Sequence, residues 1–486
     1  MDGVAIIRDI SQIGGEMLPN NSRLNALAGA NNANNRLIAN GTSGNYNNNE
    51  RINGNALRVF LEFDFKEAND PNRLVSYEEW FAIHKRCRKH KAGKSSVLEY
   101  EIRIFITLKE TADNVENFEY IPKASTTFVI EIPKIREIIA AYYGDREVQT
   151  YFVSKIERLL DKFLNPHSYS CRVGMGTLRA VIHLQEVIYE ATNEYTEDAW
   201  VFTKDLSSFF MNIDTEIWVR RLIDFIDKNY EGKDKELLKY LARIIYQQQP
   251  QKDALMHSPI TMWNRIPEEK KLKGRVGYIG IPIGDLTSQI MALFVTTWYI
   301  HNIEVLTEGI AHYTDDTGGV VKDKELFLSQ QRLINEHAQS EYGLTVNRKK
   351  FYFQHYTKGV QFLGYKIKRD RLLPSDRIYH NITWKVHVAI EKATEMSYVL
   401  HNKESFQSTV NSYLGLLKWS NSYRLRKRIV EALKESLWAV VFDFSKDYLV
   451  VKIKRQYSLG MMYKREGKQL KNSIRYDYRR IEKSAC

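Results

Sequence analysis

The feature that most constrains this chain is a short stretch, GIAHYTDDTGGVV, at residues 309–321. Two apolar segments flank Asp315 and Asp316, and the pattern predicts a strand, a tight turn and a second strand. Adjacent carboxylates in such a turn repel each other, so the fold must leave them in water or place cations on them. Because an acidic turn is most often only a turn, chemistry can be inferred only if another acid joins it.

A second acidic strand end occurs in WVFTKD, where Asp205 holds the last position. Alternation along the strand places Asp205 on the same face as Val201 and Thr203. Magnesium takes a few carboxylate oxygens together with substrate phosphates. Two such ions can lower the pKa of an attacking hydroxyl and neutralise a leaving pyrophosphate. Three carboxylates from two adjacent strands are the minimum set that could hold two such ions, so Asp205, Asp315 and Asp316 are candidate Mg²⁺ ligands.

The composition suits a polyanionic partner, because 71 Lys and Arg against 59 Asp and Glu give a formal net charge of +12. The three cysteines form no CxxC pair, which argues against a disulfide framework or a structural zinc site. No apolar run approaches the roughly 18 residues of a membrane span, and the N-terminus lacks the pattern of a signal peptide. We expect a cytoplasmic protein without a membrane partner.

Four regions follow from local patterning. Residues 1–56 are rich in Asn and Gly and predict a flexible arm. Residues 57–117 form an N-terminal extension, with a strand at 58–65 and then a helix that becomes basic. Residues 118–373 mix strands and helices, and residues 374–486 are helical and basic. Strands and helices in this arrangement predict the α+β class.

Within the mixed region, TTFVIEIPKIREI predicts a strand running into a basic turn, and REVQTYFVSKIERLLDKFL predicts a helix. Residues 215 to about 249 are expected to be helical. A Gly/Pro loop is expected to enter a long apolar helix after residue 285. LTVNRKKFYFQ and GVQFLGYKI each predict one short strand.

The motifs of this chain, in their order, resemble those of reverse transcriptases. KDLSSFFMNID, GIPIGDLTSQ and YTDD resemble the first three palm motifs, and LTVNRKKFYF and GVQFLGYKI resemble the two that follow. Upstream, IPKIREI and SYSCRVGMGTLRAV resemble finger motifs, and downstream NSYLGLLKWSNSYRLRKRI resembles the thumb of bacterial members. The resemblance, from about Phe128 to Arg428, implies a right-hand polymerase with fingers, a palm built on an antiparallel sheet, and a helical thumb.

The resemblance also implies residue roles. Asp205 and Asp315 would bridge both metal ions, and Asp316 would complete one site. Phe210 matches the steric gate that excludes a 2′-hydroxyl, although ordinary core packing is its alternative. Lys349 and Lys350 could protonate the leaving pyrophosphate. The nucleotide-binding set is Phe210, Lys134, Arg136, Arg172, Gly284, Ser288, Gln289 and Lys349. The primer grip is Phe362, Leu363, Gly364 and Tyr365.

The bacterial retroelement enzymes are the most similar group, comprising group II intron, retron, diversity-generating retroelement and phage-defence types. Ile283 before Gly284 and Gln289 after Ser288 depart from the usual Gln-Gly and Ser-Pro, and look like the diversity-generating type and related defence types. We expect a bacterial RNA-directed DNA polymerase that uses dNTPs to copy a structured non-coding RNA into DNA during antiphage defence.

Three alternatives stay open: a diversity-generating reverse transcriptase, a template-independent or protein-primed polymerase, and a non-catalytic RNA-binding scaffold. The 29 tyrosines permit protein priming without requiring it. Loss of one of the three acids would have favoured the scaffold, and all three are present. A homo-oligomer or an accessory protein is also left open.

Overall fold

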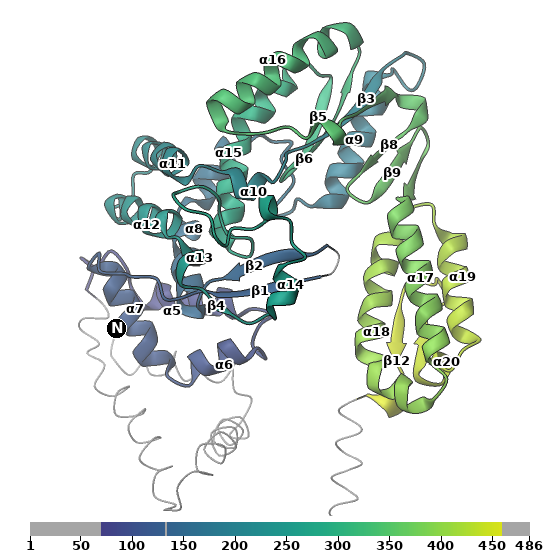
Figure 1. Cartoon of the computed structure of the whole chain (residues 1–486), viewed down its shortest axis with the longest axis horizontal. Helices are drawn as coiled ribbons and strands as arrows, with labels where there is room; N and C mark the ends of the chain where they lie inside the picture. The colour runs from purple at the N-terminus through teal and green to yellow at the C-terminus, as the bar shows by residue number, and fades with distance from the viewer. Residues whose placement is uncertain (1–69, 132–133, 459–486) are drawn as a thin grey trace, which may run out of the picture. The chain divides into compact units, whose positions relative to one another are not determined.

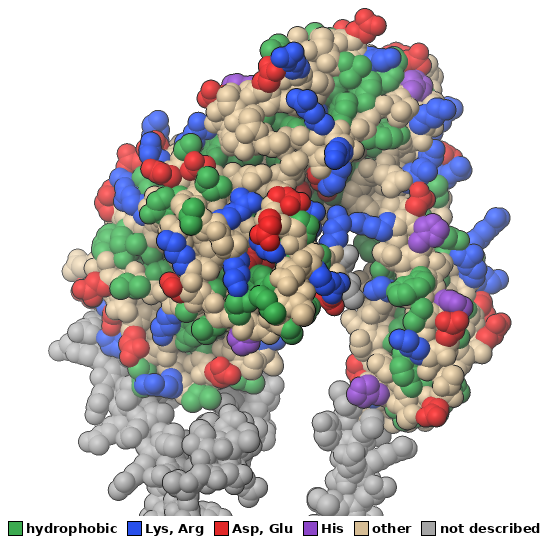
Figure 2. All heavy atoms as spheres, viewed as in Figure 1, with side chains coloured by type: hydrophobic (Ala, Val, Ile, Leu, Met, Phe, Trp, Pro, Cys, Tyr) green, Lys and Arg blue, Asp and Glu red, His purple; other side chains and the backbone are tan. Residues whose placement is uncertain are grey.

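The computed structural model describes residues 70–131 and 134–458, which divide into two compact units (Figure 1). Unit 1 contains the described residues up to Phe163 together with Phe210–Met291, and unit 2 contains Leu164–Phe209 and the described residues from Ala292 onward. Side chains of both charges are interspersed over the face drawn in Figure 2. The predicted arm and the predicted strand at 58–65 lie outside the described residues. The division into four regions stays a prediction.

Unit 1 begins with three helices that pack around a long one. α5 (Tyr77–Arg88), α6 (Ser95–Glu101) and α7 (Ile104–Glu116) precede α8 (Tyr143–Phe163). The predicted basic helix is confirmed as α5, which starts where the Ser76 side chain accepts a hydrogen bond from the Glu79 amide. The predicted helix in REVQTYFVSKIERLLDKFL is confirmed as part of α8.

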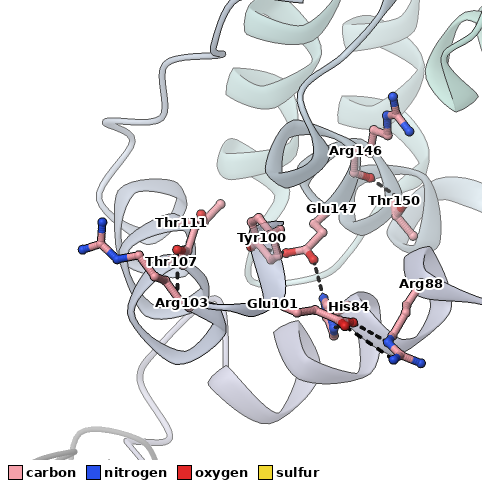
Figure 3. A network of polar contacts seen from close by, with 10 residues as sticks. All are labelled: His84, Arg88, Tyr100, Glu101, Arg103, Thr107, Thr111, Arg146, Glu147 and Thr150. Atoms are coloured by element: carbon pink, nitrogen blue, oxygen red, sulfur yellow. Dashed lines mark hydrogen bonds and ion pairs between the residues drawn. The ribbon is translucent and has the colours of Figure 1, made fainter. Parts of the chain in front are cut away.

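A buried polar network joins these helices (Figure 3). The Nδ1 atom of His84 on α5 lies 2.7 Å from Glu147 Oε1 on α8, and the Tyr100 hydroxyl of α6 donates to the other Glu147 oxygen at 2.7 Å. Glu101 approaches the second ring nitrogen of His84 at 3.4 Å and also pairs with Arg88. Because each polar group of this network has a partner, the network connects α5, α6 and α8 and leaves none of its charged groups buried without a partner.

A small sheet follows, and it corrects one expectation. β1 (Thr126–Ile130) pairs antiparallel with β2 (Arg136–Ala140), and β4 (Leu255–Met256) runs parallel beside β1. The segment predicted as a strand and a basic turn is therefore a hairpin. Glu137 takes an inward-facing position of β2, and the second strand accommodates this acid because its carboxylate accepts a hydrogen bond from the Leu272 amide.

The helical stretch from residue 215 is two helices rather than one. α11 (Thr215–Asn229) and α12 (Lys235–Gln247) are separated by a turn in which the Tyr230 hydroxyl donates to Asp234 at 2.8 Å. Short helices α10 (Phe209–Asn212), α13 (Pro250–Asp253), α14 (Ile260–Trp263) and η1 (Glu268–Lys270) complete this part. The predicted long apolar helix is confirmed as α15 (Leu286–Glu304).

Unit 2 is built on a four-stranded antiparallel sheet in the order β5-β6-β3-β7. Its strands are β3 (Trp200–Asp205), β5 (Gly309–Tyr313), β6 (Asp316–Val321) and β7 (Tyr352–His355). This confirms the predicted acidic hairpin and the predicted strand that ends on an acid.

One helix packs on each face of the four-stranded sheet. α9 (Thr177–Ala191) lies so close to one face that a Cβ atom on Gly318 would come within 2.8 Å of Leu184. α16 (Lys324–Tyr342) packs on the other face, where the rings of Phe327 and Phe202 have centroids 4.7 Å apart. A Cβ atom on Gly319 would lie 2.6 Å from the Phe202 ring. The two glycines of TDDTGGVV therefore allow close packing on the two faces.

The segment GVQFLGYKI forms a hairpin, so its prediction as one strand is wrong. β8 (Val360–Phe362) pairs with β9 (Tyr365–Lys368), and β9 pairs with β10 (Arg371–Pro374). Leu363 and Gly364 form the turn with φ of +46° and +92°, the two positive values that a type I′ turn requires. LTVNRKKFYFQ contributes the 3₁₀ turn η2 (Arg348–Lys350) before β7, and η3 (Tyr356–Lys358) follows it.

The C-terminal helical bundle comprises α17 (Asp376–Lys392), α18 (Met396–Leu417), α19 (Tyr423–Lys434) and α20 (Trp438–Val441). Trp438 and Phe406 are central to its core, with ring centroids 4.3 Å apart. Helices occupy most of the predicted helical region up to Val441, and the hairpin β11 (Phe442–Phe444) and β12 (Val451–Ile453) and the turn η4 (Arg455–Tyr457) follow them. Residues 459–486 of that region lie outside the described residues. Within the described residues, no helix is long and apolar enough to span a membrane.

Candidate active site

Backbone pairing brings the three acids to one end of the four-stranded sheet. Asp205, the last residue of β3, is the register partner of Asp316, the first residue of β6. Directly opposed residues of antiparallel strands point to the same face, with Cβ atoms about 4.5–5.5 Å apart. Asp315 precedes Asp316 in the turn, and its carbonyl oxygen accepts from the Leu206 amide at 3.1 Å. Strand pairing at Asp205 and the hydrogen bond from Leu206 thus join the end of β3 to the turn that carries Asp315 and Asp316.

The turn that carries Asp315 is strained and anchored. Thr314 has a φ of +61°, an outlier for a β-branched residue. Its amide donates to the Ser170 hydroxyl at 3.1 Å, and the Tyr169 amide donates to the His312 carbonyl at 2.8 Å. The loop before α9 therefore holds the turn in place. Burial lowers the pKa of His312 to about 3, so this ring adds no positive charge beneath the acids.

The Asp205 carboxylate is buried and already holds a cationic group. Lys350 Nζ donates to both of its oxygens at 2.7 and 2.8 Å, and Asn347 Nδ2 donates at 3.2 Å. The Asn347 amide also donates to the Asp205 carbonyl at 2.8 Å. Lys349, which the resemblance selected, is exposed, and its amide donates to the Asn347 side chain at 3.2 Å.

Backbone pairing brings the three acids to the same end of the sheet, but their side chains do not form a ready metal-binding cluster. Across residues 70–131 and 134–458, no group of three or more His, Cys, Asp and Glu side chains is arranged to hold a metal ion. Asp205 instead interacts with Lys350 and Asn347. The structure therefore places the predicted ligands on neighbouring strands, and their role as metal ligands stays a prediction.

On the opposite face of β3, Lys204 is buried between aromatic rings. Its Nζ atom lies 5.8 Å from the ring centroids of both Phe327 and Phe351. The atom has no hydrogen-bond partner among the described residues. Burial lowers the pKa of Lys204 to about 7. Lys204 and Asp205 thus present a weakened base and an acid to opposite faces of one strand.

Unit 1 holds Phe210, the predicted steric gate, against an apolar cluster. Phe210 and Ile283 pack against the buried side chains of Ile139, Met211 and Leu272. The Ile281 amide donates to the Phe210 carbonyl at 2.8 Å, which joins the two segments. The packing alternative for Phe210 is therefore met in part, since its ring is only half-buried.

Gly284, which follows Ile283, needs to be glycine. Its φ is +137°, and a Cβ atom there would lie 3.1 Å from the Ile139 carbonyl oxygen. The next residue, Asp285, is buried and accepts from the Ala141 amide at 3.3 Å, and burial raises the pKa of its carboxyl. The backbone around Gly284 is thus held close to β2.

Ser288 and Gln289, which the resemblance places beneath the template base, lie in the first turn of α15. Ser288 is buried, whereas Gln289 is exposed. Of this pair, only Gln289 is therefore open to contact with a nucleic acid. That contact stays a prediction.

The remaining predicted residues occupy two different settings. Lys134 and Arg136 are exposed at the β1–β2 hairpin of unit 1. In unit 2, Arg172 donates from one nitrogen to the carbonyls of Asn165 and Ser168 at 2.9 and 3.0 Å. This guanidinium therefore supports the loop that anchors the acidic turn. Its contact with a nucleotide stays a prediction.

The predicted primer grip is the tip of the β8–β9 hairpin. Phe362 and Tyr365 are buried register partners on either side of the Leu363–Gly364 turn. The Tyr365 hydroxyl donates to the Leu416 carbonyl of α18 at 3.0 Å. The motif therefore connects the sheet region to the C-terminal bundle, while its contact with a primer stays a prediction.

A family model described as reverse transcriptase (RNA-dependent DNA polymerase) matches residues 121–367. This chain belongs to the reverse transcriptase family. The match confirms the predicted family and the right-hand polymerase fold class, and the activity of the family is RNA-directed DNA polymerisation, a nucleotidyl transfer. The predicted bacterial retroelement type is a finer assignment that the family model does not make.

Solved telomerase structures are also similar to this reverse transcriptase. Apo telomerase from Candida tropicalis is 12% identical with a TM-score of 0.37, over 65% of this chain and 63% of that one. Telomerase from Candida albicans with the TWJ fragment of telomeric RNA is 12% identical with a TM-score of 0.39, over 69% and 59%. The chain thus spans less than two thirds of these structures. No curated protein sequence matches it.

Two features of this reverse transcriptase were missed by sequence reasoning. The pairing of Lys350, rather than Lys349, with Asp205 depends on the η2 turn, which shifts the strand periodicity just before β7. The strain at Thr314 depends on the length of the β5–β6 turn. A Thr placed between two strands at the tip of a tight hairpin was the available signal for the second feature.

Proposed function

We propose that this chain is an RNA-directed DNA polymerase whose catalytic residues Asp205, Asp315 and Asp316 hold two Mg²⁺ ions. The observation that supports this most is the cross-strand register of Asp205 and Asp316, with Asp315 held beside them by the Leu206 amide. These side chains fit two Mg²⁺ ions, because three carboxylates lie on neighbouring strands and one of them, Asp205, already forms an ion pair with the Lys350 ammonium. When bound, the ions would activate the primer hydroxyl and neutralise the leaving pyrophosphate.

The residues around Asp205 would prepare it for this role. Asn347 restrains both the backbone and the carboxylate of Asp205, so that the acid does not reorient when its partner changes. The Lys350 side chain is 54% exposed, which allows it to leave Asp205 and approach the phosphates of an incoming nucleotide. Lys350 would then stabilise the pyrophosphate charge and donate a proton to it.

Residues of unit 1 would select the sugar and support the base pair. The half-buried Phe210 ring is held by the Ile139 cluster, so it could exclude a 2′-hydroxyl without moving. Gly284 lets the backbone approach a nucleotide because no Cβ occupies that space. Lys134 and Arg136 are exposed cations on a hairpin and suit contacts with a triphosphate.

The C-terminal bundle has the chemistry of an RNA-binding surface. Trp384, Trp419 and Tyr423 are 64%, 51% and 55% exposed, which is unusual for large aromatic side chains. Lys418 Nζ lies 4.7 Å from the Trp419 ring centroid, so aromatic and cationic groups occur together. Such pairs stack on unpaired bases and contact the neighbouring phosphates. This supports a structured RNA as the partner of the bundle. We propose that a dedicated non-coding RNA is the template and that it is copied in the bacterial cytoplasm during antiphage defence.

The decisive test supplies the purified full chain with a defined RNA template, a DNA primer, dNTPs and Mg²⁺. DNA complementary to the supplied RNA is the expected product. DNA whose sequence ignores the RNA would favour the template-independent or protein-primed alternative, and RNA binding without DNA synthesis would favour the scaffold. Sequencing the RNA and DNA that co-purify with the chain would then separate a dedicated non-coding RNA from the template of a diversity-generating element.

A further inference from the structure

A basic and aromatic surface lies in unit 2, at the end of the β8–β9–β10 sheet that is opposite to the predicted primer grip. The primer-grip turn joins β8 to β9, whereas this surface surrounds the turn that joins β9 to β10. Its tyrosines come from α9 and the turn after it, and α9 lies beside the β8–β9 hairpin (Figure 1). We call it the Arg369 surface, and its members are Tyr189, Tyr195, Lys358, Lys368, Arg369 and Arg371.

The turn after α9 holds Tyr195 in a fixed position. Asn193, Glu194 and Tyr195 have φ values of +44°, +58° and +67°, in the left-handed region that residues with a Cβ atom rarely adopt. The Tyr195 amide donates to the hydroxyl of buried Thr192 at 3.0 Å, and its carbonyl accepts from the Tyr356 hydroxyl at 3.1 Å. The fold therefore keeps an unfavourable backbone conformation in order to present this side chain.

Arg369 places its guanidinium group over the Tyr195 ring. The guanidinium carbon lies 5.4 Å from the ring centroid. The Tyr356 ring also stacks on Tyr195, with centroids 6.0 Å apart and an interplanar angle of 23°. Arg369 is exposed, and among the residues that the structure describes it has no hydrogen bond or ion pair. Its planar group and its N–H donors are thus available to a ligand.

Positive charges lie beside this stack. Lys368 of β9 and Arg371 of β10 are register partners, and like charges placed directly opposite each other destabilise a sheet. Lys368 Nζ donates to the Lys358 carbonyl at 2.7 Å, which brings a third basic residue to the same end of the sheet. Asp370 lies 3.6 Å from Arg371 and offsets one of these charges. The remaining excess suits a polyanion.

The Arg369 surface is remote from the three acids of the candidate active site. The Tyr356 amide donates to the Ala199 carbonyl at 3.1 Å, immediately before β3 begins. Asp205 is the last residue of β3. At about 3.3 Å per residue, the chain from Ala199 to Asp205 spans roughly 20 Å. A nucleic acid bound at the Arg369 surface would therefore lie away from the position of nucleotide addition.

We propose that the Arg369 surface binds an unpaired segment of RNA. One base would stack on the Arg369 guanidinium, and Tyr189, which is 41% exposed, would contact a neighbouring base. Lys358, Lys368 and Arg371 would contact the phosphates on either side. An unpaired segment is favoured over a duplex because the bases of a duplex are already stacked on one another. RNA is favoured over DNA because RNA is single-stranded before it is copied, whereas new DNA is paired with its template.

The choice of RNA rests on the proposed function, but the binding can be measured without DNA synthesis. The full chain is photo-crosslinked to an unstructured RNA of about 12 nucleotides, within the range of known single-strand sites. The RNA carries 4-thiouridine, EDTA is present and dNTPs are absent. Peptide mass spectrometry should find crosslinks at Tyr189 or Tyr195. A chain that crosslinks there and makes no DNA would contradict the proposed function alone.

Variants of Arg369 test the stacking contact. Arg369→Gln should raise the RNA concentration for half-maximal crosslinking at these tyrosines about tenfold, the scale of one lost base stack. Arg369→Lys keeps the charge but loses the planar group, so it should also raise that concentration. Arg332→Gln removes the same charge from an exposed arginine of α16 and should leave it unchanged. Because both arginines are exposed, thermal unfolding should stay the same.

Four results would each contradict the proposal. In the first, RNA crosslinks only to other parts of the chain. In the second, Arg369→Gln behaves like Arg332→Gln. In the third, Arg369→Lys keeps the wild-type value, since charge alone would then explain the binding. In the fourth, an RNA duplex of the same sequence, or a DNA strand carrying 4-thiothymidine, crosslinks at these tyrosines as readily as the unpaired RNA.

Discussion

At the scale of single residues, the acids at the end of the four-stranded sheet are held by the backbone rather than by one another. Register pairing fixes Asp205 and Asp316, and the Leu206 amide fixes the peptide of Asp315. Like charges placed in this way gain nothing for the fold, since each raises the energy of the next. The proposed Mg²⁺ ions would therefore give these acids a reason to lie together that the stability of the fold does not give.

Removing two of these acids should stop catalysis and spare the fold. We expect Asp315→Ala combined with Asp316→Ala to abolish dNTP incorporation, because both carboxylates are proposed metal ligands. Thermal unfolding and RNA binding should change little. Asp370→Ala, in the exposed turn between β9 and β10, makes the same substitution away from the site and should stay active. Primer extension measures the outcome, and extension by the double variant at the wild-type rate would contradict the metal-ligand assignment.

The two neighbouring lysines should differ in function, although the sequence pairs them. Lys350→Met should lower the rate of incorporation by about a hundredfold, the lower end of what a general acid contributes. Lys349→Met should have little effect, because Lys349 does not contact Asp205. Primer extension with saturating dNTPs measures the rates of both variants. Equal effects of the two substitutions would show that the contact with Asp205 has no role in catalysis.

Sugar selection should depend on the ring of Phe210. Phe210→Ala should increase the use of rNTPs relative to dNTPs by about 1–3 kcal/mol of selectivity, since a small-group steric discrimination is removed. Phe210→Tyr keeps the ring and should keep the preference. Competition between the two kinds of nucleotide in primer extension measures the ratio. An unchanged ratio in Phe210→Ala would assign the steric gate to another residue.

At the scale of elements, periodicity predicted the helices and alternation predicted the strands. Turns that need positive φ values were not predicted. α8 and α15 were predictable because long apolar patterns leave few alternatives. The β8–β9 hairpin was not, because Leu363 occupies a position of positive φ that usually carries Asn, Asp or Gly. Its apolar packing against the core outweighs the backbone strain.

The candidate site also contains parts that the sequence predicts and parts that it does not. The positions of Asp205, Asp315 and Asp316 were predictable because strand ends and acidic turns are visible in the sequence. The contacts of Lys350 were not, since they depend on a single 3₁₀ turn that no periodicity reveals. The Arg369 surface was also hidden, because Tyr195 and Arg369 are distant in the chain and meet only in the folded structure.

The buried network of α5, α6 and α8 should make the stability of unit 1 depend on pH. Burial alone would lower the pKa of His84, but its hydrogen bonds to Glu101 and Glu147 outweigh burial and raise it. The folded state therefore holds a proton that the unfolded chain loses near pH 6.5. The stabilising contribution is complete below that pH and is lost as the pH rises through the raised pKa, with a slope of at most about 1.4 kcal/mol per pH unit.

His84→Gln should remove this dependence, because its amide cannot take up the proton. Urea unfolding followed by circular dichroism between pH 6 and 9 measures the free energy of unfolding for both proteins. The matched control is His387→Gln, which changes an exposed histidine on α17. A wild-type slope that persists in His84→Gln would mean that another group holds the proton.

At the scale of the whole molecule, nearly all of the basic excess lies in the C-terminal region, because residues 374–486 contain 22 Lys and Arg against 11 Asp and Glu and so carry +11 of the net charge of +12. Over the C-terminal bundle, Figure 2 shows Lys, Arg and His side chains beside acidic ones. Specific contacts with RNA should therefore come from the exposed aromatic residues, and the general attraction from the net charge of +12. Truncation of the C-terminal region separates these two contributions only if the bundle survives the cut.

A cut near Phe444 would damage the bundle. Phe444 ends β11, whose partner β12 holds the buried Val451. The Val451 amide donates to Asn411 Oδ1 at 2.8 Å, and its carbonyl accepts from Gln407 at 3.0 Å, so β12 is fixed to α18. Removing β12 would expose the core of the bundle. Weaker RNA binding by such a variant could then result from unfolding rather than from lost contacts. A cut after Ser458 keeps both strands and the η4 turn.

The chain without residues 459–486 should bind RNA more weakly while keeping the thermal stability of the full chain. Lys and Arg outnumber Asp and Glu in that segment, which lies outside the described residues. For every RNA phosphate that the shortened chain no longer neutralises, the slope of log affinity against log salt should fall by roughly 0.7–0.9. A full-length variant with Lys464, Arg465, Lys471 and Arg475 changed to Gln keeps the length and should show a similar decrease if charge is the cause.

Filter binding across salt concentrations measures both proteins. The same affinity and the same salt slope as the full chain would show that the segment does not bind RNA phosphates.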